Sequence, residues 1–299
     1  MNILNKLRNL SGWRSGTKQV SIDATIPLIA LPVLTLIAAQ TIYLTVIVFL
    51  LTPIIIYHLH HNFLRFLPRS KFFLMWTITS VIMLMLVFEM CVVPLLEILF
   101  EENCVFMAGV VGGIFCGVKT KSKSDSALQN DSLEHDSEVG RESEEVCLLC
   151  KKPPPARTYH CRTCQTCVAN REYHCKWLDC CIGSSNLRWY LSCLLCSAVA
   201  FIYGSNLTMT SVCHPFILIG TILLPDDCSD VYHQLDLALC LVSAIYSLLI
   251  GLVVLSYLIY HIYLILLRTT AQERRISSQS RNEYNGLLTN ISTLVCHEL

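Results

Sequence analysis

The long apolar runs of this 299-residue chain limit its fold more than any other feature of the sequence. Residues 25–57 are almost wholly apolar, and further runs follow at 72–100, 104–118, 189–209 and 237–267. A helix needs about 20 apolar residues to cross the hydrocarbon core of a bilayer. Charged residues make up only 15% of the chain, whereas about 25% is typical of soluble domains. The sequence therefore predicts an all-α polytopic membrane protein.

Charged residues beside these runs indicate which ends face the cytoplasm. Residues 1–23 carry four basic side chains against one acid, and residues 58–71 carry three basic side chains and no acid. Basic flanks favour the cytoplasmic side of a membrane. Two cytoplasmic flanks need an even number of crossings between them, which favours a helical hairpin at 25–57 over one tilted helix. We therefore expect six spans with both termini in the cytoplasm, and four spans is the main alternative.

The changes in composition divide the chain into six segments. Residues 119–146 are rich in Ser, Asp and Glu and poor in large apolar residues, which is typical of disorder. The expected segments are a cytoplasmic N-terminus (1–23), an N-terminal transmembrane region (24–118), a disordered acidic linker (119–146), a cytoplasmic Cys-rich domain (147–186), a C-terminal pair of spans with a lumenal loop (187–267) and a cytoplasmic tail (268–299). In the lumenal loop, Cys213 and Cys228 are either free or joined as a disulfide.

Eight of the 17 cysteines lie within residues 147–181, together with His160 and His174. The cytoplasm is reducing, so metal binding is favoured over a disulfide framework. The cluster holds three Cys-x2-Cys pairs with zinc-knuckle spacing, at 147/150, 161/164 and 164/167. A structural zinc ion takes four Cys or His ligands, so ten candidates exceed by two the eight that two ions need. The cluster therefore predicts a small zinc-folded domain with cysteine to spare.

Two function classes are disfavoured by charge. The 22 basic residues balance the 22 acidic residues, whereas a nucleic-acid-binding protein needs a basic face. Within the apolar runs the acidic residues are essentially Glu89 and Glu97, and transport pathways use more such groups. We therefore expect neither a nucleic acid partner nor a transporter.

The run CLLCKKPPPARTYHCRTCQTCVANREYHCKWLDCCIGSSN, at 147–186, resembles the Cys-rich domain of the DHHC protein S-acyltransferases, or palmitoyltransferases. The resemblance extends more loosely over the flanking spans and the tail. It implies two structural zinc ions. The first would be held by Cys147, Cys150, His160 and Cys167, and the second by Cys161, Cys164, His174 and Cys181.

The same resemblance implies an activity and its catalytic candidates. Cys175 would be the nucleophile that takes a fatty acyl group from an acyl-CoA, such as palmitoyl-CoA, and passes it to substrate cysteines. The family has an Asp-His pair before this cysteine, and this chain has Glu172 and Tyr173. A tyrosine with a pKa near 10 is a poor base at neutral pH. Cys180 stands where the family usually has asparagine, and Thr270 with Glu273 resembles its Thr-Thr-x-Glu motif with the Glu one position late.

Two functions follow as hypotheses. The first is a protein-cysteine S-palmitoyltransferase that uses Cys175, Glu172 and Tyr173. The second is a catalytically weak or dead relative, a zinc-folded membrane scaffold that binds partners. The expected partners are the bilayer and cytoplasmic-face proteins with cysteines near the membrane, and an accessory subunit could supply the missing base. The expected location is an endomembrane, either the Golgi or the endoplasmic reticulum.

Overall fold

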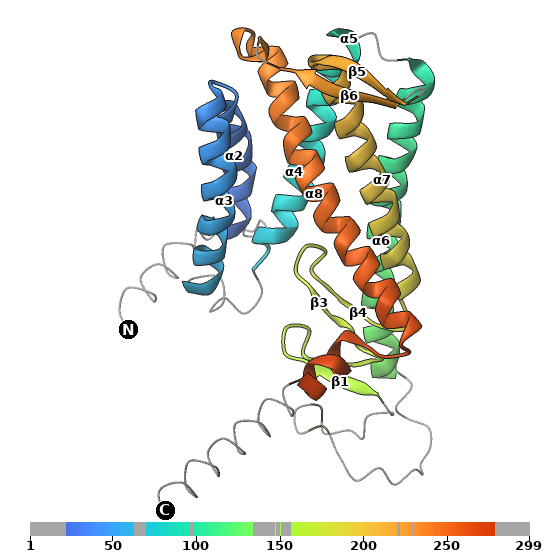
Figure 1. Cartoon of the computed structure of the whole chain (residues 1–299). Helices are drawn as coiled ribbons and strands as arrows, with labels where there is room; N and C mark the ends of the chain where they lie inside the picture. The colour runs from blue at the N-terminus through green and yellow to red at the C-terminus, as the bar shows by residue number, and fades with distance from the viewer. Residues whose placement is uncertain are drawn as a thin grey trace, which may run out of the picture. The chain divides into compact units, whose positions relative to one another are not determined.

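The computed structural model describes residues 22–62, 70–95, 99–133, 147, 150, 157–219, 222–228 and 230–278 (Figure 1). The predicted N-terminus lies outside these ranges up to residue 21, and so does the tail from residue 279. In the described ranges, five helices are long and apolar enough to cross a membrane: α3 (Ile42–Asn62), α4 (Phe72–Val87) with the π-helical turn η2 (Phe88–Val92), α6 (Phe100–Leu133), α7 (Leu187–Val212) and α8 (Leu235–Leu266). The helix α2 (Ile22–Ala38) is apolar but shorter, and a three-residue helix α5 (Val93–Leu95) follows η2. The predicted all-α membrane fold is confirmed, and the number of crossings stays a prediction.

The chain divides into two units, and boundaries between them fall inside the helices α6, α7 and α8. The helical unit consists of Met1–Phe115, Lys176–Asp179 and Ser192–Leu255. The cysteine-rich unit consists of Cys116–Cys175, Cys180–Leu191 and Ser256–Leu299. The functional residues predicted from the sequence all fall in the cysteine-rich unit.

The first apolar run of the chain folds as two helices, α2 and α3, which lie side by side in the helical unit (Figure 1). The chain turns at Ala39 and Gln40. The Thr41 hydroxyl then accepts a hydrogen bond from the Leu44 amide at 3.3 Å, and so caps the start of α3. The Thr45 hydroxyl donates to the Ala38 carbonyl at 2.7 Å, which satisfies one of the last carbonyls of α2. This is the pair of helices expected of a hairpin.

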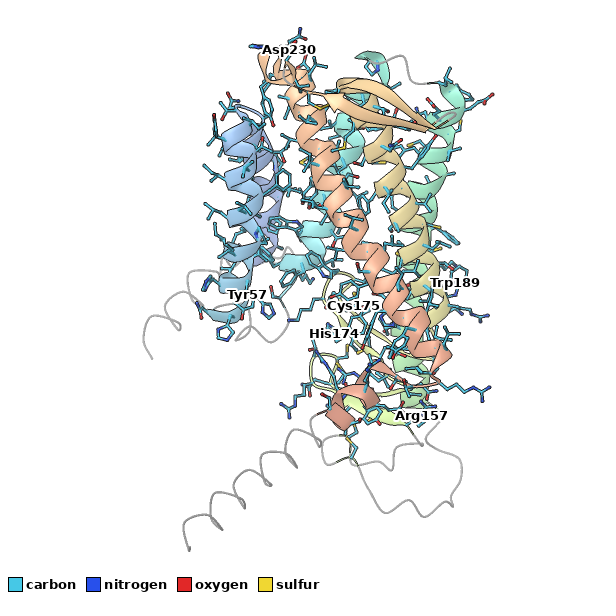
Figure 2. The ribbon with its side chains drawn as sticks, viewed as in Figure 1. Tyr57, Arg157, His174, Cys175, Trp189 and Asp230 are labelled. Atoms are coloured by element: carbon cyan, nitrogen blue, oxygen red, sulfur yellow. A yellow bond between two sulfur atoms is a disulfide. The ribbon has the colours of Figure 1, made fainter. Side chains whose placement is uncertain are left out.

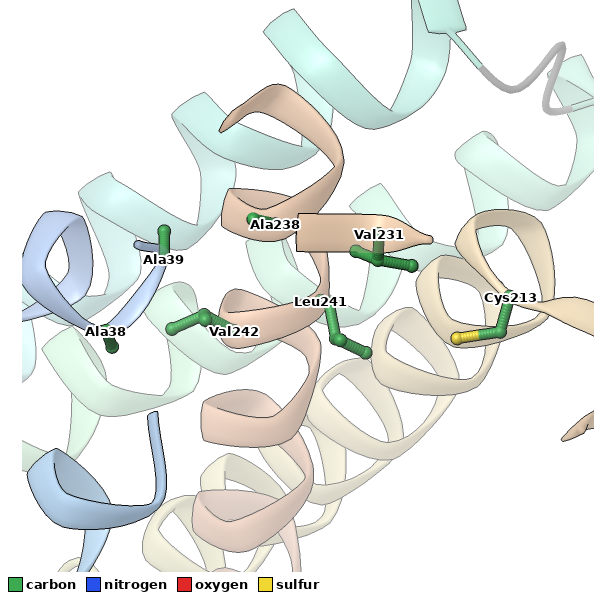
Figure 3. Close-up of a cluster of buried hydrophobic side chains, with 7 residues drawn as sticks. All are labelled: Ala38, Ala39, Cys213, Val231, Ala238, Leu241 and Val242. Carbon is green, nitrogen blue, oxygen red and sulfur yellow. The ribbon is translucent and has the colours of Figure 1, made fainter. Parts of the chain in front are cut away.

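The helical unit is held together by buried apolar side chains and by small residues. One cluster joins the hairpin turn to the start of α8, and it consists of Ala38, Ala39, Cys213, Val231, Ala238, Leu241 and Val242 (Figure 3). The helices α6 and α7 approach closely at glycines. A methyl group on Gly109 would lie 3.2 Å from Cβ of Ala200, and one on Gly113 would lie 3.0 Å from Oγ of Ser197. These glycines therefore act in helix packing, as their spacing predicts.

The loop between α7 and α8 is a β-hairpin with a disulfide at its base. Strand β5 (His214–Ile219) pairs antiparallel with β6 (Ile222–Asp227), and a short 3-10 turn η4 (Val231–His233) leads into α8. Cys213 and Cys228 form a disulfide that closes the hairpin. Of the two alternatives for these cysteines, the structure has the bonded one.

The helix α6 extends further than the sequence suggests. We expected the linker to begin at residue 119, but the helix continues to Leu133. Residues 119–133 contain no Gly or Pro and include Lys, Ala, Leu and Gln, which are good helix formers. The Thr120 side chain is fully buried, and its hydroxyl donates to the Cys116 carbonyl at 2.7 Å. The rest of the predicted linker, 134–146, lies outside the described residues.

The cysteine-rich unit is built on two short antiparallel hairpins. Strand β1 (Thr158–Cys161) pairs with β2 (Thr166–Ala169), and β3 (Tyr173–Cys175) pairs with β4 (Cys180–Ile182). The hairpins meet at Gly183, where an added methyl group would lie 2.8 Å from the Ala169 carbonyl oxygen. After α8, residues 271–278 form one more short helix in this unit.

Candidate active site

Two groups of four cysteine and histidine side chains converge in the cysteine-rich unit. The first group is Cys147, Cys150, His160 and Cys167, and the second is Cys161, Cys164, His174 and Cys181. In each group the four ligand atoms all lie within 4.8 Å of one another. The hairpins explain the convergence, because His160 lies directly opposite Cys167 and His174 directly opposite Cys181. The structure thus brings together the two sets of four residues that the family resemblance implied.

The spacing of these atoms fits zinc. In the first group, Nδ1 of His160 is 3.2 Å from Sγ of Cys150, and Sγ of Cys150 is 3.6 Å from Sγ of Cys167. In the second group, Nδ1 of His174 is 3.4 Å from Sγ of Cys164. Zinc–ligand bonds of about 2.0–2.3 Å in a tetrahedron separate the ligand atoms by about 3.5–3.8 Å. Each group is therefore compatible with one zinc ion held by three thiolates and a histidine.

Cys175 ends strand β3, one residue after the His174 ligand, and belongs to neither group (Figure 2). Its side chain is buried, with 4% exposed. In the β3–β4 register it lies opposite Cys180, which is also buried. The hairpin therefore holds two thiols outside the zinc groups, and Cys175 is the one that occupies the predicted nucleophile position.

Glu172 is a buried carboxylate just before β3. It accepts a hydrogen bond from the Ala271 amide at 2.7 Å, and its own amide donates to the Ile182 carbonyl at 2.9 Å. Burial raises the pKa of Glu172, and the bond from Ala271 opposes that shift. The same carboxylate oxygen lies 4.0 Å from Nδ1 of His261, at the end of α8. The carboxylate thus links the reactive strand to the segment that follows α8.

Tyr173 fills the position of the family's first histidine with a buried phenol. Its hydroxyl is hydrogen-bonded to the Tyr190 hydroxyl, and its ring stacks on the His261 ring with centroids 5.6 Å apart. Burial raises the pKa of Tyr173 above its ordinary value of 10.0. The phenol therefore stays protonated at neutral pH and does not act as a base.

The segment after α8 is fixed to the hairpins by a capping box and an ion pair. The Thr270 amide donates to the Glu273 carboxylate at 2.8 Å, and the Glu273 amide donates to the Thr270 hydroxyl at 3.2 Å. The Arg157 guanidinium donates to both oxygens of the same carboxylate, at 2.6 and 2.7 Å. The bonds from Arg157 are the main reason that the pKa of Glu273 falls from 4.5 to about 2. The late Glu of the tail motif is thus the one that caps the helix at 271–278.

Comparison with known proteins places this site in a family. The family model described as DHHC palmitoyltransferase matches residues 140–278. Residues 140–278 thus form a DHHC palmitoyltransferase domain. The chain is also 29% identical to palmitoyltransferase ZDHHC23-B of Danio rerio, over 92% of this chain and 73% of the relative. It is 26% identical to palmitoyltransferase ZDHHC23 of Mus musculus, over 80% of this chain and 65% of the relative.

Asn186 connects the DHHC domain to the membrane helices that flank it in sequence. Its side chain is fully buried just before α7. Its amide donates to the Thr120 carbonyl of α6 at 3.0 Å and to the Cys181 carbonyl at 2.9 Å, and its oxygen accepts from the Gly183 amide at 3.0 Å. All but one of the side chain's usual hydrogen bonds are made, so this residue fixes the second zinc group to α6 at Thr120.

Two residues of this site lie outside the motif and were missed by sequence reasoning. Tyr190 is buried in the first turn of α7, and its hydroxyl is paired with that of Tyr173. His261 is buried near the end of α8, against Glu172 and Tyr173. The signal for His261 was present, because an ionisable residue in an apolar span marks a functional site by default.

Proposed function

We propose that this multi-pass membrane protein is a protein-cysteine S-palmitoyltransferase that works through an acyl-enzyme on Cys175. The observation that carries the proposal is a buried thiol next to a candidate zinc ligand, on the strand that follows the Glu172 carboxylate of a DHHC domain. The relatives named above are all called palmitoyltransferases, which favours the enzyme over a zinc-folded scaffold.

The reaction is two successive thioester exchanges. The Cys175 thiolate attacks the thioester carbonyl of palmitoyl-CoA, and CoA leaves as a thiolate that takes up a proton. A substrate cysteine then attacks the palmitoyl-Cys175 thioester and releases the Cys175 thiol. No oxidant or further co-substrate is needed. The protein supplies the position of the thiol and a base that removes its proton.

The two zinc groups act in folding. The described hairpins of the domain are short and carry few large apolar side chains, so metal binding supplies much of their folding free energy. The ligands fix the register of both hairpins, and His174 fixes the strand that ends in Cys175. The zinc ions thus hold the nucleophile in place.

The substrates and the compartment follow from where this thiol lies in the chain. Cys175 is 12 positions before Leu187, where α7 begins, so its palmitoyl chain stays in or near the bilayer. We therefore infer substrate proteins whose cysteines lie close to the cytoplasmic membrane surface. An endomembrane of the Golgi or endoplasmic reticulum is the proposed compartment, and an accessory subunit remains a proposed partner.

Autoacylation tests this function, with the purified full-length protein and an alkyne-tagged palmitoyl-CoA. Wild type should acquire a label that hydroxylamine removes, and Cys175→Ser should acquire none. Cys180→Ser is the matched control, because it removes the other buried thiol of the same hairpin and should keep the label. Zinc is counted in all three proteins. Absence of label from wild type with two zinc ions bound would favour the scaffold.

A further inference from the structure

His261 is a buried imidazole with no hydrogen bond at one of its ring nitrogens. Its side chain is 1% exposed, and Nε2 has no hydrogen-bond partner among the residues that the structure describes. Its other nitrogen, Nδ1, lies 4.0 Å from the Glu172 carboxylate, which is 5% exposed. Buried polar groups are normally hydrogen-bonded, so an orphaned nitrogen calls for an explanation.

The Glu172 carboxylate favours one nitrogen of His261 over the other as the proton acceptor. A carboxylate beside Nδ1 favours the tautomer that carries hydrogen on Nδ1. In that tautomer Nε2 has a free lone pair. The family supplies the same two groups, a carboxylate and an imidazole, from the adjacent Asp and His of its motif. Here they come from Glu172 and His261.

His261 also lies on the face of β3 that carries the nucleophile. Successive side chains of a strand point to opposite faces, so Tyr173 and Cys175 share one face. The His261 ring stacks on the Tyr173 ring at an interplanar angle of 16°, and the Tyr190 ring meets it edge-on with centroids 5.4 Å apart. The imidazole is therefore held by two aromatic rings beside the residue that shares a face with the thiol.

We propose that His261 is the general base of this site and replaces the histidine that is absent at position 173. The proposal rests on the palmitoyltransferase function argued above. Nε2 of His261 accepts the Cys175 thiol proton, and Glu172 stabilises the resulting imidazolium. The thiolate attacks the acyl-CoA thioester, and the imidazolium returns the proton to the CoA thiolate as the C–S bond to CoA breaks. Hydrogen bonds of this kind often close only when substrate is bound.

The other groups near the thiol are poorer candidates for this base. The Tyr173 hydroxyl is already paired with Tyr190, and a phenol with an ordinary pKa near 10 is a weak acceptor at neutral pH. His174 directs Nδ1 into the second zinc group. His261 differs from both because its free nitrogen is committed to no other group in the described part of the chain.

The test compares wild type, His261→Gln, Tyr173→His and the double variant in single-turnover autoacylation. Loss of a general base costs about 10²–10⁴-fold in rate, and His261→Gln should lose that much while it keeps two zinc ions. Tyr173→His returns an imidazole to the family's position, so in that background His261→Gln should cost far less. His233→Gln is the matched control, since that side chain is 81% exposed, and it should behave as wild type.

A second readout separates this proposal from the function on which it rests. Trypsin releases residues 172–176 as a peptide whose only cysteine is Cys175, so its alkylation by iodoacetamide can be followed by mass spectrometry. His261→Gln should slow this alkylation by about tenfold or more, because the thiolate is the reactive form. The alkylation rate tests the role of His261 even where no palmitoyl label appears. Unchanged alkylation, or an equal loss of rate in both Tyr173 backgrounds, would overturn the proposal.

Discussion

Cys175 occupies a position that corresponds to a zinc ligand, but the cysteine that would complete its zinc knuckle is absent. The two zinc groups repeat at a fixed spacing, because each ligand of the second group follows its counterpart by the same number of positions (147 and 161, 150 and 164, 160 and 174, 167 and 181). In this repeat Cys175 is the counterpart of Cys161. Cys161 shares a zinc knuckle with Cys164, whereas the residue three positions after Cys175 is Leu178. Cys175 therefore holds the first position of a knuckle whose second cysteine is absent, and it belongs to neither zinc group.

The repeat also accounts for the tyrosine at position 173. Tyr159-His160-Cys161 and Tyr173-His174-Cys175 are the same three residues, each in the first strand of its hairpin. At position 173, where the family has its catalytic histidine, the second hairpin therefore has the same residue type as the first hairpin has at position 159. This is why the base, in our proposal, comes from a helix that lies far along the chain.

Asn186→Ala should destabilise the DHHC domain more than its small change in volume suggests. The substitution leaves the buried Gly183 amide and the Thr120 and Cys181 carbonyls without this partner. Each unsatisfied buried group costs about 1–3 kcal/mol, so the loss of three such bonds should lower the free energy of unfolding by at least about 3 kcal/mol. Chemical unfolding with release of zinc as the signal measures this loss. Asn206→Ala, at an exposed position, should change the value by less than about 0.5 kcal/mol, and an equal effect of both variants would contradict the argument.

At the scale of elements, the two zinc groups should lose their ions separately, although the second group takes Cys161 and Cys164 from the first hairpin. Cys150→Ser and Cys164→Ser each leave one group with three ligands, so the zinc content should fall from two to one per chain. Cys164→Ser should also abolish autoacylation, because its group contains His174, the neighbour of Cys175. Elemental analysis and the label measure the two effects. Cys104→Ser removes an exposed cysteine outside both groups and should keep two zinc ions, and two zinc ions in Cys164→Ser would refute the assignment.

The ion pair that fixes the helix at 271–278 should be insensitive to pH over the range in which zinc stays bound. Because the pKa of Glu273 is lowered from 4.5 to about 2, its contribution to stability is complete above 4.5 and is lost only as the pH falls towards 2. Glu273→Gln should therefore lower the unfolding temperature by the same amount at about pH 6 and about pH 8. Thermal unfolding at the two pH values measures the difference. A difference that disappears at the lower pH would show that another group titrates there.

The sequence predicts elements better than it predicts their contacts. Apolar runs and zinc-knuckle spacing are local patterns, and they were enough to find the helices and a zinc-binding cluster, whereas the family resemblance divided eight of its residues into two groups. The extension of α6 to Leu133 was missed because the composition of 119–133 is polar, although Asn186 fixes this helix from 66 positions away. His261 could be seen in the sequence as an ionisable residue in an apolar run, but its partner could not, since only the fold brings this part of α8 against Glu172. Contacts between distant segments leave no pattern in either segment alone.

At the scale of the whole molecule, the helix α7 separates two chemical environments. Its 26 residues span about 39 Å, which exceeds the hydrocarbon core of about 30 Å. Residues before α7 hold reduced cysteines in zinc groups, whereas Cys213, directly after it, is joined to Cys228. Thiolate ligands persist in a reducing compartment, and structural disulfides form in an oxidising one. The two ends of α7 should therefore face opposite sides of the membrane, with the DHHC domain in the cytoplasm.

Two exposed positions at the two ends of α7 allow this orientation to be tested. Ser185 lies just before the helix, and Asp230 lies two positions after the disulfide-bonded Cys228, in the segment between α7 and α8. In sealed microsomes with the cytoplasmic face outward, a membrane-impermeant maleimide should modify Ser185→Cys directly. It should modify Asp230→Cys only after detergent opens the vesicles, because that residue then lies on the lumenal side. Modification of both variants in intact vesicles would mean that the segment from α7 to α8 does not cross the membrane, and the reverse pattern would place the zinc groups in the lumen. The expected pattern puts Cys175 on the side where acyl-CoA and free thiols are found, which is the condition that the proposed transfer requires.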